Sequence, residues 1–574
     1  MITLGVRAIF LLLHTLIYRT SFFFSWTLFS FAIINFTIDF ILDLERLVFF
    51  FCVSWIASAV FHFSLSYIRN EKFKDRFFLL LISFVLSIFA LVFSANLFSL
   101  IIGWDGLGIT SFLLVIFFQN KDSLNAGLVT VFTNRVGDVF FISGIALITS
   151  YFCWNAYIFS LRAFLEENFF LSILLVLGAF TKRAQIPFSR WLPAAIAAPT
   201  PVSSLVHSRT LVTAGVYVLF RFKNSLNDSV MLGLCLFFGS LTMCIAGLGG
   251  LFERDFKKIV ALSTLSQLGL IISNLGLGAF IITFFHLITH AFFKALLFLA
   301  TGRSIHRADD YQDLRKISIP WFSSPITSAI AIISNFSLIG LPFFSGFYSK
   351  DIILELSLRS SISFSLLILF FLGTLLTILY SLRFILLSRE NSLKKTAFFS
   401  HSDYDSTVIS SFDYLFCLAV IRGSFLNWFY LAWSPQFFLS CEIKNLTLSL
   451  IFFGLIASWL MPSHFFLRNT LFPQWTLGTI WNLSHLSKVI FKNQLFYFSF
   501  MCNKHTEIFF SHEILFFSPF ALIQKNIFWS NLISFSSFFF SLCFFFCCFC
   551  FVWKLKFIKI SFGLIFGFAF KLLL

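Results

Sequence analysis

Apolar stretches long enough to cross a lipid bilayer recur along almost the whole chain, and this repetition constrains the fold more than any single motif. About fourteen or fifteen such stretches can be distinguished by length, with no long polar segment between them. Only 11% of the residues are charged, whereas a soluble domain has about 25%. The sequence therefore predicts an all-α, polytopic membrane protein.

The positive net charge of +16 is spread over short loops between the apolar stretches, such as Arg69–Arg76. Loop charges of this kind set the topology of a membrane protein, so we expect membrane lipids and no nucleic acid as partners. The eleven cysteines lack the spacing of zinc or iron–sulfur ligands, and the chain has no glycine-rich nucleotide fingerprint and no P-loop. We therefore expect this chain to bind no metal and no cofactor.

One apolar run carries three titratable side chains near the middle of a predicted helix, between Gly278 and Gly302. At 1.5 Å per residue the run is about 34 Å long, enough to cross a bilayer. His286, His290 and Lys294 are spaced four apart, so they share one helix face. An ammonium at that depth costs on the order of 3 kcal/mol unless it is paired, hydrated or neutral. A polar contact between helices accounts for one histidine, but the three together favour a proton or ion path.

Two further sets of charges lie in the preceding spans. Asp105 is the one ionised side chain in the apolar stretch 94–120. It is either a carboxylate that carries protons or a structural ion pair or cap near the membrane surface. Arg135 and Asp138, in the next span, are three residues apart and can pair on one helix face. For that pair a structural or tuning role is favoured over proton transfer.

The segment 171–222 contains four prolines, which an unbroken helix cannot accommodate. Within a membrane, non-helical backbone is tolerated where it is buried in protein or lines a hydrated cavity. Lys182 precedes this predicted break and His207 enters the following helix. If Asp105 lies near Lys182, each group biases the protonation of the other.

A second apolar block, from about residue 229, repeats these features. Asp255 and Lys257 stand at the entry to one predicted helix. Further on, glycines and a proline interrupt the segment NFSLIGLPFFSGFYSKDIILE, which also carries Lys350 and Asp351. Two broken segments that each carry a lysine, in corresponding positions of two halves, are typical of an inverted-repeat transporter.

The motifs of residues 90–355 resemble those of subunit 5 of respiratory complex I (mitochondrial NADH–ubiquinone oxidoreductase), a family related to the Mrp-type cation/proton antiporters. The matching stretches are GWDGLGITSF, NRVGD, TKRAQIPFSRWLPAAIAAPTPVSSLVHSRTLVTAG, DFKKIVALSTLSQLGL, HLITHAFFKALLFLATG, QDLRK and GLPFFSGFYSKD. The chain departs from the family in having Asp105 in place of the usual glutamate. It also has Arg183, Arg190 and Arg209 where small or neutral residues are usual.

The resemblance implies two inverted five-helix repeats, each with a broken helix, followed by a lateral amphipathic helix and an anchor helix. The implied divisions are 1–75 (N-terminal transmembrane helices), 76–225 (first repeat), 226–395 (second repeat) and 396–574 (C-terminal helices, with the lateral helix in 483–524 and the anchor in 531–553). The implied proton-translocating residues are Asp105, Lys182, His207, His286, His290, Lys294 and Lys350. The implied tuning or structural residues are Arg135, Asp138, Asp255, Lys257 and Asp351.

By this resemblance the chain is a proton-translocating membrane-arm subunit of complex I in the mitochondrial inner membrane. Its neighbours would be other membrane-arm subunits, especially chain 4. NADH, FMN, iron–sulfur clusters and ubiquinone would belong to partner subunits, which carry out the electron transfer. Two alternatives stay open: a stand-alone Mrp-type cation/proton antiporter subunit, and a structural membrane subunit whose channel has decayed.

Overall fold

The computed structural model describes most of the chain up to residue 460. The described residues are 11–12, 14–15, 18, 20–31, 34–149, 169–206, 211–226, 229–308, 311–314, 324–360, 362–390, 405–428 and 441–460. The expected lateral and anchor helices lie outside these residues, as do His207 and Arg209.

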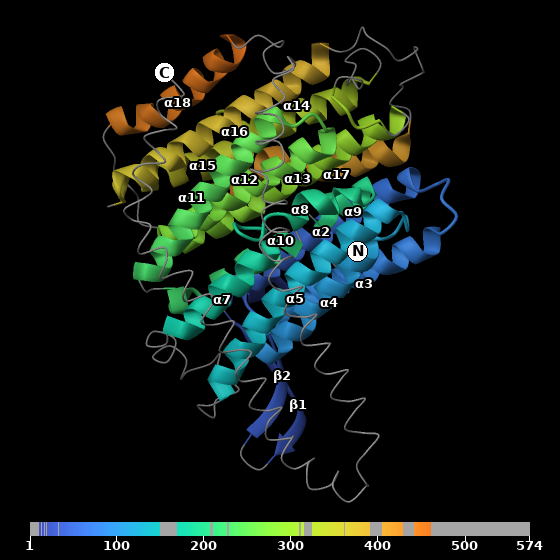
Figure 1. Ribbon diagram of the computed structural model, residues 1–574, viewed down its shortest axis with the longest axis vertical. Helices are drawn as coiled ribbons and strands as arrows, with labels where there is room; N and C mark the ends of the chain where they lie inside the picture. Colours follow the sequence, from blue (N-terminus) through green and yellow to red (C-terminus); the bar gives the residue numbers. More distant parts are fainter. Residues whose placement is uncertain are drawn as a thin grey trace, which may run out of the picture. The chain divides into compact units, whose positions relative to one another are not determined.

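Helices make up nearly all of the described structure (Figure 1). The elements up to residue 226 are α2 (Leu44–Tyr67), α3 (Lys74–Phe93), α4 (Leu97–Val115), α5 (Lys121–Thr149), α7 (Phe169–Lys182), α8 (Trp191–Ala194), η1 (Ala195–Ala197), α9 (Thr200–Leu205), α10 (Leu211–Arg221) and η3 (Lys223–Leu226). Those that follow are α11 (Ser229–Phe252), α12 (Phe256–Gly276), α13 (Phe280–Arg307), α14 (Pro325–Ile339), α15 (Ser345–Arg359), α16 (Phe364–Glu390), α17 (Ser406–Leu426) and α18 (Cys441–Leu460).

The prediction of a polytopic helical membrane protein is confirmed. Within the described residues, nine helices are long and apolar enough to cross a membrane, and four shorter apolar helices accompany them. The expected total of fourteen or fifteen spans extends into parts of the chain beyond these residues, so it stays a prediction.

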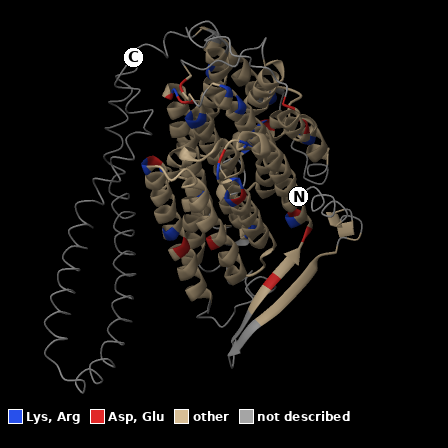
Figure 2. Ribbon diagram, turned by 90° about the vertical axis from the view of Figure 1, so that its right-hand side faces the viewer, with Lys and Arg blue, Asp and Glu red and all other residues tan. Residues whose placement is uncertain are grey.

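The helices form two groups, with α13 between them. In the first group α3 packs on α4, α4 on α5, and α5 on α7. In the second group α11 packs on α12 and α16, and α16 on α18. Helix α13 contacts α2, α9 and α10 as well as α12, α14, α15 and α17. The ribbon segments of Lys and Arg lie inside this bundle as well as at its ends (Figure 2). A helix in this central place is shielded from lipid, which explains how it can hold polar side chains.

A β-hairpin precedes the first long helix, in the part of the chain, 1–75, where N-terminal transmembrane helices were expected. Strand β1 (Phe22–Phe31) pairs antiparallel with β2 (Ile34–Leu42). Aromatic and β-branched residues dominate both strands, and such residues favour extended backbone. In β2 the alternate side chains of Thr37, Asp39 and Ile41 are buried. The backbone N–H of Ala95 donates to the Asp39 carbonyl over 2.8 Å, which ties the hairpin to the turn between α3 and α4.

Both predicted helix breaks are confirmed. Helix α7 ends at Lys182, and non-helical backbone then leads to the short helices α8 and α9. Helix α14 ends at Ile339 and is capped by Gly340, whose φ of 88° is in the left-handed region that favours glycine. At Gly346, in the first turn of α15, an added Cβ would lie 1.7 Å from the Ser337 carbonyl oxygen, so only glycine allows this close approach.

Helix α13 does not end at Gly302, as the sequence suggested, but continues to Arg307. The glycine serves packing instead. A Cβ at this position would lie 2.9 Å from the Cβ and Oγ1 of Thr200, the first residue of α9. Gly302 therefore lets the central helix approach the broken region of the first group.

Candidate functional site

Lys294 lies at the centre of the bundle, on α13, and is fully buried. Its Nζ donates to the Ser263 hydroxyl of α12 over 2.5 Å. Among the described residues no carboxylate forms an ion pair with it. A neutral hydroxyl is a weak partner for an ammonium, so this lysine is held in a site that does little to stabilise its charge.

His286 connects α13 with two neighbouring helices. Its Nδ1 lies 2.8 Å from the Ser349 hydroxyl of α15, and its Nε2 lies 3.3 Å from Oε1 of Gln267 on α12. The Thr289 hydroxyl lies 3.1 Å from the same serine. The ring of His290, one turn further along α13, is also buried, and its centroid lies 6.2 Å from that of His286. The stripe predicted from the sequence therefore faces protein.

Lys350 is buried in the first turns of α15, after the second break. Its Nζ donates to the Ile339 carbonyl over 3.1 Å and to the Thr377 hydroxyl of α16 over 2.9 Å. The break supplies the first partner, because Ile339 is the last residue of α14. Asp351 does not pair with Lys350 and interacts with Thr447 of α18 instead. A small cavity beside α18 is lined by Lys350, Asp351 and Thr374 together with apolar residues.

Helix α16 contributes a tyrosine that sequence reasoning missed. The Tyr380 hydroxyl lies 2.8 Å from that of Ser266 on α12, and both residues are buried. The signal was present as Thr374, Thr377 and Tyr380 at intervals of three in an apolar span. It was overlooked because hydroxyls carry no formal charge.

Lys182 is the buried lysine of the first group. It is the last residue of α7, directly before the first break, and is fully buried. Its Nζ donates to the Trp104 carbonyl of α4 over 2.5 Å and lies 3.8 Å from the centroid of the Trp104 ring. The carboxylates of Asp138 and Asp105 both act on it electrostatically without forming an ion pair. The site therefore combines a backbone acceptor, an aromatic face and two nearby negative charges.

Asp105 pairs with Arg135, and not directly with Lys182 as the sequence suggested. The Arg135 Nη1 lies 3.7 Å from Asp105 Oδ2 and 3.2 Å from Asp138 Oδ2. The expected contact between Arg135 and Asp138 is thus present. Because two carboxylates share one guanidinium, one negative charge is not neutralised by Arg135 and can interact with Lys182. Asp105 and Arg135 are partly exposed on the surface of the bundle, whereas Lys182 is fully buried.

The entry to α12 is tied to the chain that follows α13. Asp255 pairs with Lys258, at 2.5 Å, while Lys257 is buried. The N–H of Phe256 donates to the Gln312 carbonyl over 2.9 Å, and the N–H of Leu314 to the Arg254 carbonyl over 2.9 Å. The charged residues expected at this entry therefore lie at a structural junction.

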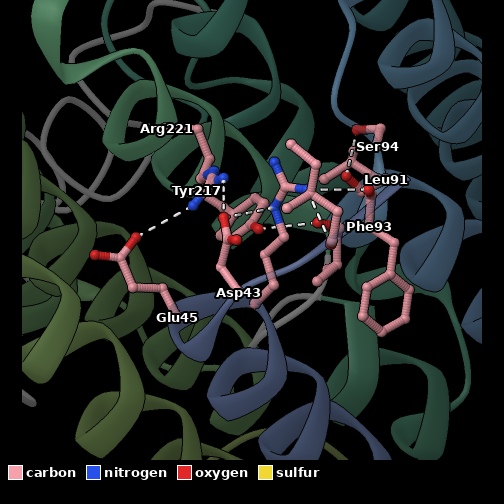
Figure 3. A network of polar contacts seen from close by, with 10 residues as sticks. Asp43, Glu45, Leu91, Phe93, Ser94, Tyr217 and Arg221 are labelled. Carbon is pink, nitrogen blue, oxygen red and sulfur yellow. Dashed lines mark hydrogen bonds and ion pairs between the residues drawn. The ribbon is translucent and has the colours of Figure 1, made fainter. Parts of the chain in front are cut away.

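A separate ionic network joins the start of α2 to the end of α10 (Figure 3). Arg221 donates to Asp43 over 2.9 Å and to Glu45 over 3.2 Å. Nearby, the Tyr217 hydroxyl donates to the Val92 carbonyl over 2.9 Å. These contacts hold α2, α3 and α10 together.

Arg183 follows Lys182 directly and is fully buried in the first break. No described residue accepts a hydrogen bond from its guanidinium. Its stem lies against α10, where a Cβ added at Gly215 would come within 2.6 Å of Arg183 Cγ. Nothing in the structure explains why an arginine stands at this position.

The described part of the chain contains no cluster of three or more His, Cys, Asp or Glu side chains that would hold a metal. What it contains is a series of buried proton donors and acceptors on facing helices. Lys182 lies on α7, Lys294 on the central helix α13 and Lys350 on α15, and each donates to a hydroxyl or a carbonyl. Such groups can pass protons by exchanging hydrogen bonds.

Two family models match successive parts of the chain. Residues 94–377 match the model described as "NADH:quinone oxidoreductase/Mrp antiporter, TM", and residues 380–555 match "NADH dehydrogenase subunit 5 C-terminus". Among similar proteins, the NADH-ubiquinone oxidoreductase chain 5 of Aedes aegypti is 42% identical over 495 residues, covering 85% of this chain and 84% of the relative. That of Locusta migratoria is 43% identical over 473 residues, covering 80% and 82%.

Solved structures show a similar fold. The Mrp complex from Dietzia sp. aligns with a TM-score of 0.69 at 23% identity, covering 85% of this chain and 56% of the other. The chain therefore spans little more than half of that matched chain. An archaeal respiratory membrane complex, the membrane-bound sulfane sulfur reductase, aligns with a TM-score of 0.60 at 19% identity, covering 72% and 83%.

Proposed function

Because the chain belongs to the NADH-ubiquinone oxidoreductase chain 5 family, we propose that it moves protons across the membrane along its line of buried lysines. Membership makes it a proton-pumping membrane-arm subunit of complex I and a part of that NADH:ubiquinone oxidoreductase. The observation that supports the path is the burial of Lys182, Lys294 and Lys350 within one helical bundle.

The path begins at the pair formed by Lys182 and its carboxylates. Asp105 and Asp138 contact Arg135 and are also near enough for their negative charge to stabilise a protonated Lys182. When the carboxylates move away from Lys182, that stabilisation is lost and the proton is released. Moving one proton against about 150 mV costs roughly 3.5 kcal/mol. A change in the charge next to a buried lysine is large enough to supply a difference of that size.

From the first group the proton passes to α13 and leaves through the second group. His207 is the proposed carrier between them and lies outside the described residues. Lys294, His290 and His286 then offer successive sites along one helix, and Lys350 is the last. Arg135, Asp138, Asp255, Lys257 and Asp351 are the proposed tuning or structural residues. The divisions at residues 75, 225 and 395 mark the N-terminal helices, the two repeats and the C-terminal helices.

We assign the redox reaction to partner subunits. NADH, FMN, iron–sulfur clusters and ubiquinone would be bound there, and their reduction would change the electrostatics of the membrane arm. The proposed location is the mitochondrial inner membrane, and the proposed neighbours are other membrane-arm subunits, chain 4 in particular. The match to the chain 5 C-terminal model over residues 380–555 favours this role over a stand-alone Mrp-type antiporter. The three buried lysines argue against a decayed channel.

Lys294→Ala tests the proposal in the assembled complex reconstituted into liposomes. We expect proton pumping to fall by at least about tenfold, because a side chain that transfers the proton commonly contributes more than that. NADH oxidation slows as well, since the two processes are coupled. The control is Lys72→Ala, which removes an exposed lysine from the loop before α3. Unchanged pumping and turnover in a fully assembled Lys294→Ala complex would instead make the subunit a scaffold.

A further inference from the structure

His286 on α13 has a polar side chain at each of its ring nitrogens. The Ser349 hydroxyl of α15 lies 2.8 Å from Nδ1, and Oε1 of Gln267 on α12 lies 3.3 Å from Nε2. All three side chains are buried, so bulk water does not compete for these contacts. The groups that the two nitrogens face decide which of them carries the hydrogen of a neutral imidazole. The chemistry of Gln267 and Ser349 therefore determines how this histidine exchanges a proton.

The group at Nε2 is a pure acceptor. An amide oxygen has lone pairs and no hydrogen, so its contact with the ring requires an N–H on Nε2. The same amide also interacts with the Tyr380 hydroxyl of α16, which gives it a second anchor. Because an amide oxygen is not a titratable base, the hydrogen on Nε2 stays with His286.

The group at Nδ1 can either donate or accept. Besides Nδ1, the Ser349 hydroxyl reaches the carbonyl of Gly346, one turn earlier in α15, over 3.3 Å. While this hydroxyl donates to Gly346, its lone pairs can accept an N–H from Nδ1. After the O–H bond has rotated, the same hydroxyl donates to an Nδ1 that carries no hydrogen. Ser349 therefore suits both protonation states of Nδ1.

Together the two partners accommodate a neutral and a charged His286 with the ring in one place. In the neutral ring the hydrogen is on Nε2 and faces Gln267, while Ser349 donates to Nδ1. In the imidazolium both nitrogens carry a hydrogen, and each faces an oxygen that accepts it. Lys350 and His290 are titratable neighbours of this ring, so the protonation of each group depends on that of the others.

We propose that Gln267 is a positioning residue that keeps a hydrogen on Nε2 of His286, so that the histidine takes up and releases its transferred proton at Nδ1 alone. This inference rests on the proposed function, in which His286 is one of the proton sites. A proton adds to the Nδ1 lone pair to give the imidazolium, and its loss from the same nitrogen restores the neutral ring. The exchange takes place on the side of α15 and the second break, and it requires only the rotation of one hydroxyl.

The test uses proton pumping per NADH oxidised by the assembled complex in liposomes, measured over a range of pH. Gln267→Met keeps the size of the side chain but removes the acceptor, and we expect the ratio to fall roughly two- to tenfold, the factor that a single hydrogen bond accounts for. The matched control is Asn274→Leu on the same helix. That amide is equally buried but has no hydrogen-bond partner among the described residues, so the ratio should not change.

Gln267→Glu distinguishes an acceptor from a residue that only packs. The carboxylate keeps an oxygen at Nε2 and stabilises the imidazolium, so the part of the pH profile that depends on His286 should move by about one unit or more toward alkaline pH. A profile that does not move would mean that Gln267 only packs. A loss as deep as that of Gln267→Met would mean that the amide donates to Nε2. Either result overturns the inference.

A double variant shows whether Gln267 acts through His286. Gln267→Met combined with His286→Ala should pump no worse than His286→Ala alone, whereas effects that multiply overturn the inference. If Gln267→Met does not assemble, the pH profile of Gln267→Glu decides alone, and failure of both to assemble makes the amide a structural tie and overturns the inference. Normal pumping by Lys294→Ala would overturn the proposed function instead.

Discussion

The two groups of helices hold their lysines in different ways. Lys182 in the first group has a carbonyl, an aromatic face and the field of two carboxylates around it. Lys294 on the central helix α13 and Lys350 on α15 bind only hydroxyls and one carbonyl, with no ion pair to either among the described residues. A buried ammonium with negative charge nearby keeps its proton, whereas one held by neutral groups gives it up more readily. The two environments therefore differ in whether a carboxylate lies near the buried ammonium.

Replacing each lysine with methionine should separate the two environments most clearly. Lys182→Met leaves Asp105 and Asp138 without their buried cation, so we expect a loss of about 2 kcal/mol of stability, reduced because Asp105 is partly exposed. Lys294→Met removes an ammonium that has no acidic partner, and should leave stability unchanged or raised by about 1 kcal/mol. Thermal denaturation of the purified complex measures both. Equal losses would show that the two lysines are held alike.

The packing that joins the two groups can be tested at Gly302. Gly302→Ala would place a Cβ 2.9 Å from Thr200, and α13 would have to move away from α9. Overpacking of this kind costs about 1–3 kcal/mol. The control is Gly233→Ala on α11, where no atom lies within 4 Å of the added Cβ and stability should not fall. Comparable melting temperatures for the two variants would contradict the close approach.

The smallest expected effect concerns Glu253, in the turn between α11 and α12. Burial raises the pKa of this carboxyl above its ordinary value of 4.5, although Lys258 and Arg383 act in the opposite direction. A raised pKa in the folded state favours the protonated form, so its contribution to stability is full below pH 4.5 and declines as the pH rises through the raised pKa. Glu253→Gln should flatten this dependence by no more than about 1 kcal/mol. Melting curves at several pH values check the slope, and an unchanged slope would contradict the assignment.

The sequence was sufficient for features that follow from periodicity. It predicted the buried stripe of His286, His290 and Lys294, because spacing by four defines a helix face in any context. It predicted both breaks, because proline and glycine act on the local backbone. The contact between Arg135 and Asp138 followed for the same reason, since both residues belong to one helix.

Contacts between helices could not be predicted from sequence periodicity. Asp105 lies in the same region as Lys182, but which cation it meets depends on how α4, α5 and α7 rotate against one another. The role of Gly302 depends likewise on the approach of α9. The hairpin was missed because apolar strands and apolar helical segments share a composition, and the alternation in β2 is short. Tyr380 was missed because a tyrosine is neutral at physiological pH and gives no charge signal in an apolar span.

The tie between the start of α12 and the chain after α13 has a mechanical consequence. The backbone bonds of Phe256 and Leu314 hold the start of α12 to the chain after α13. At the opposite end only three residues connect α12, which ends at Gly276, to α13, which begins at Phe280. The pair is therefore fastened at both ends, and any change in the spacing of the two helices is confined to their middle turns. The contacts of Lys294 with Ser263 and of His286 with Gln267 lie in those turns, at 2.5 Å and 3.3 Å.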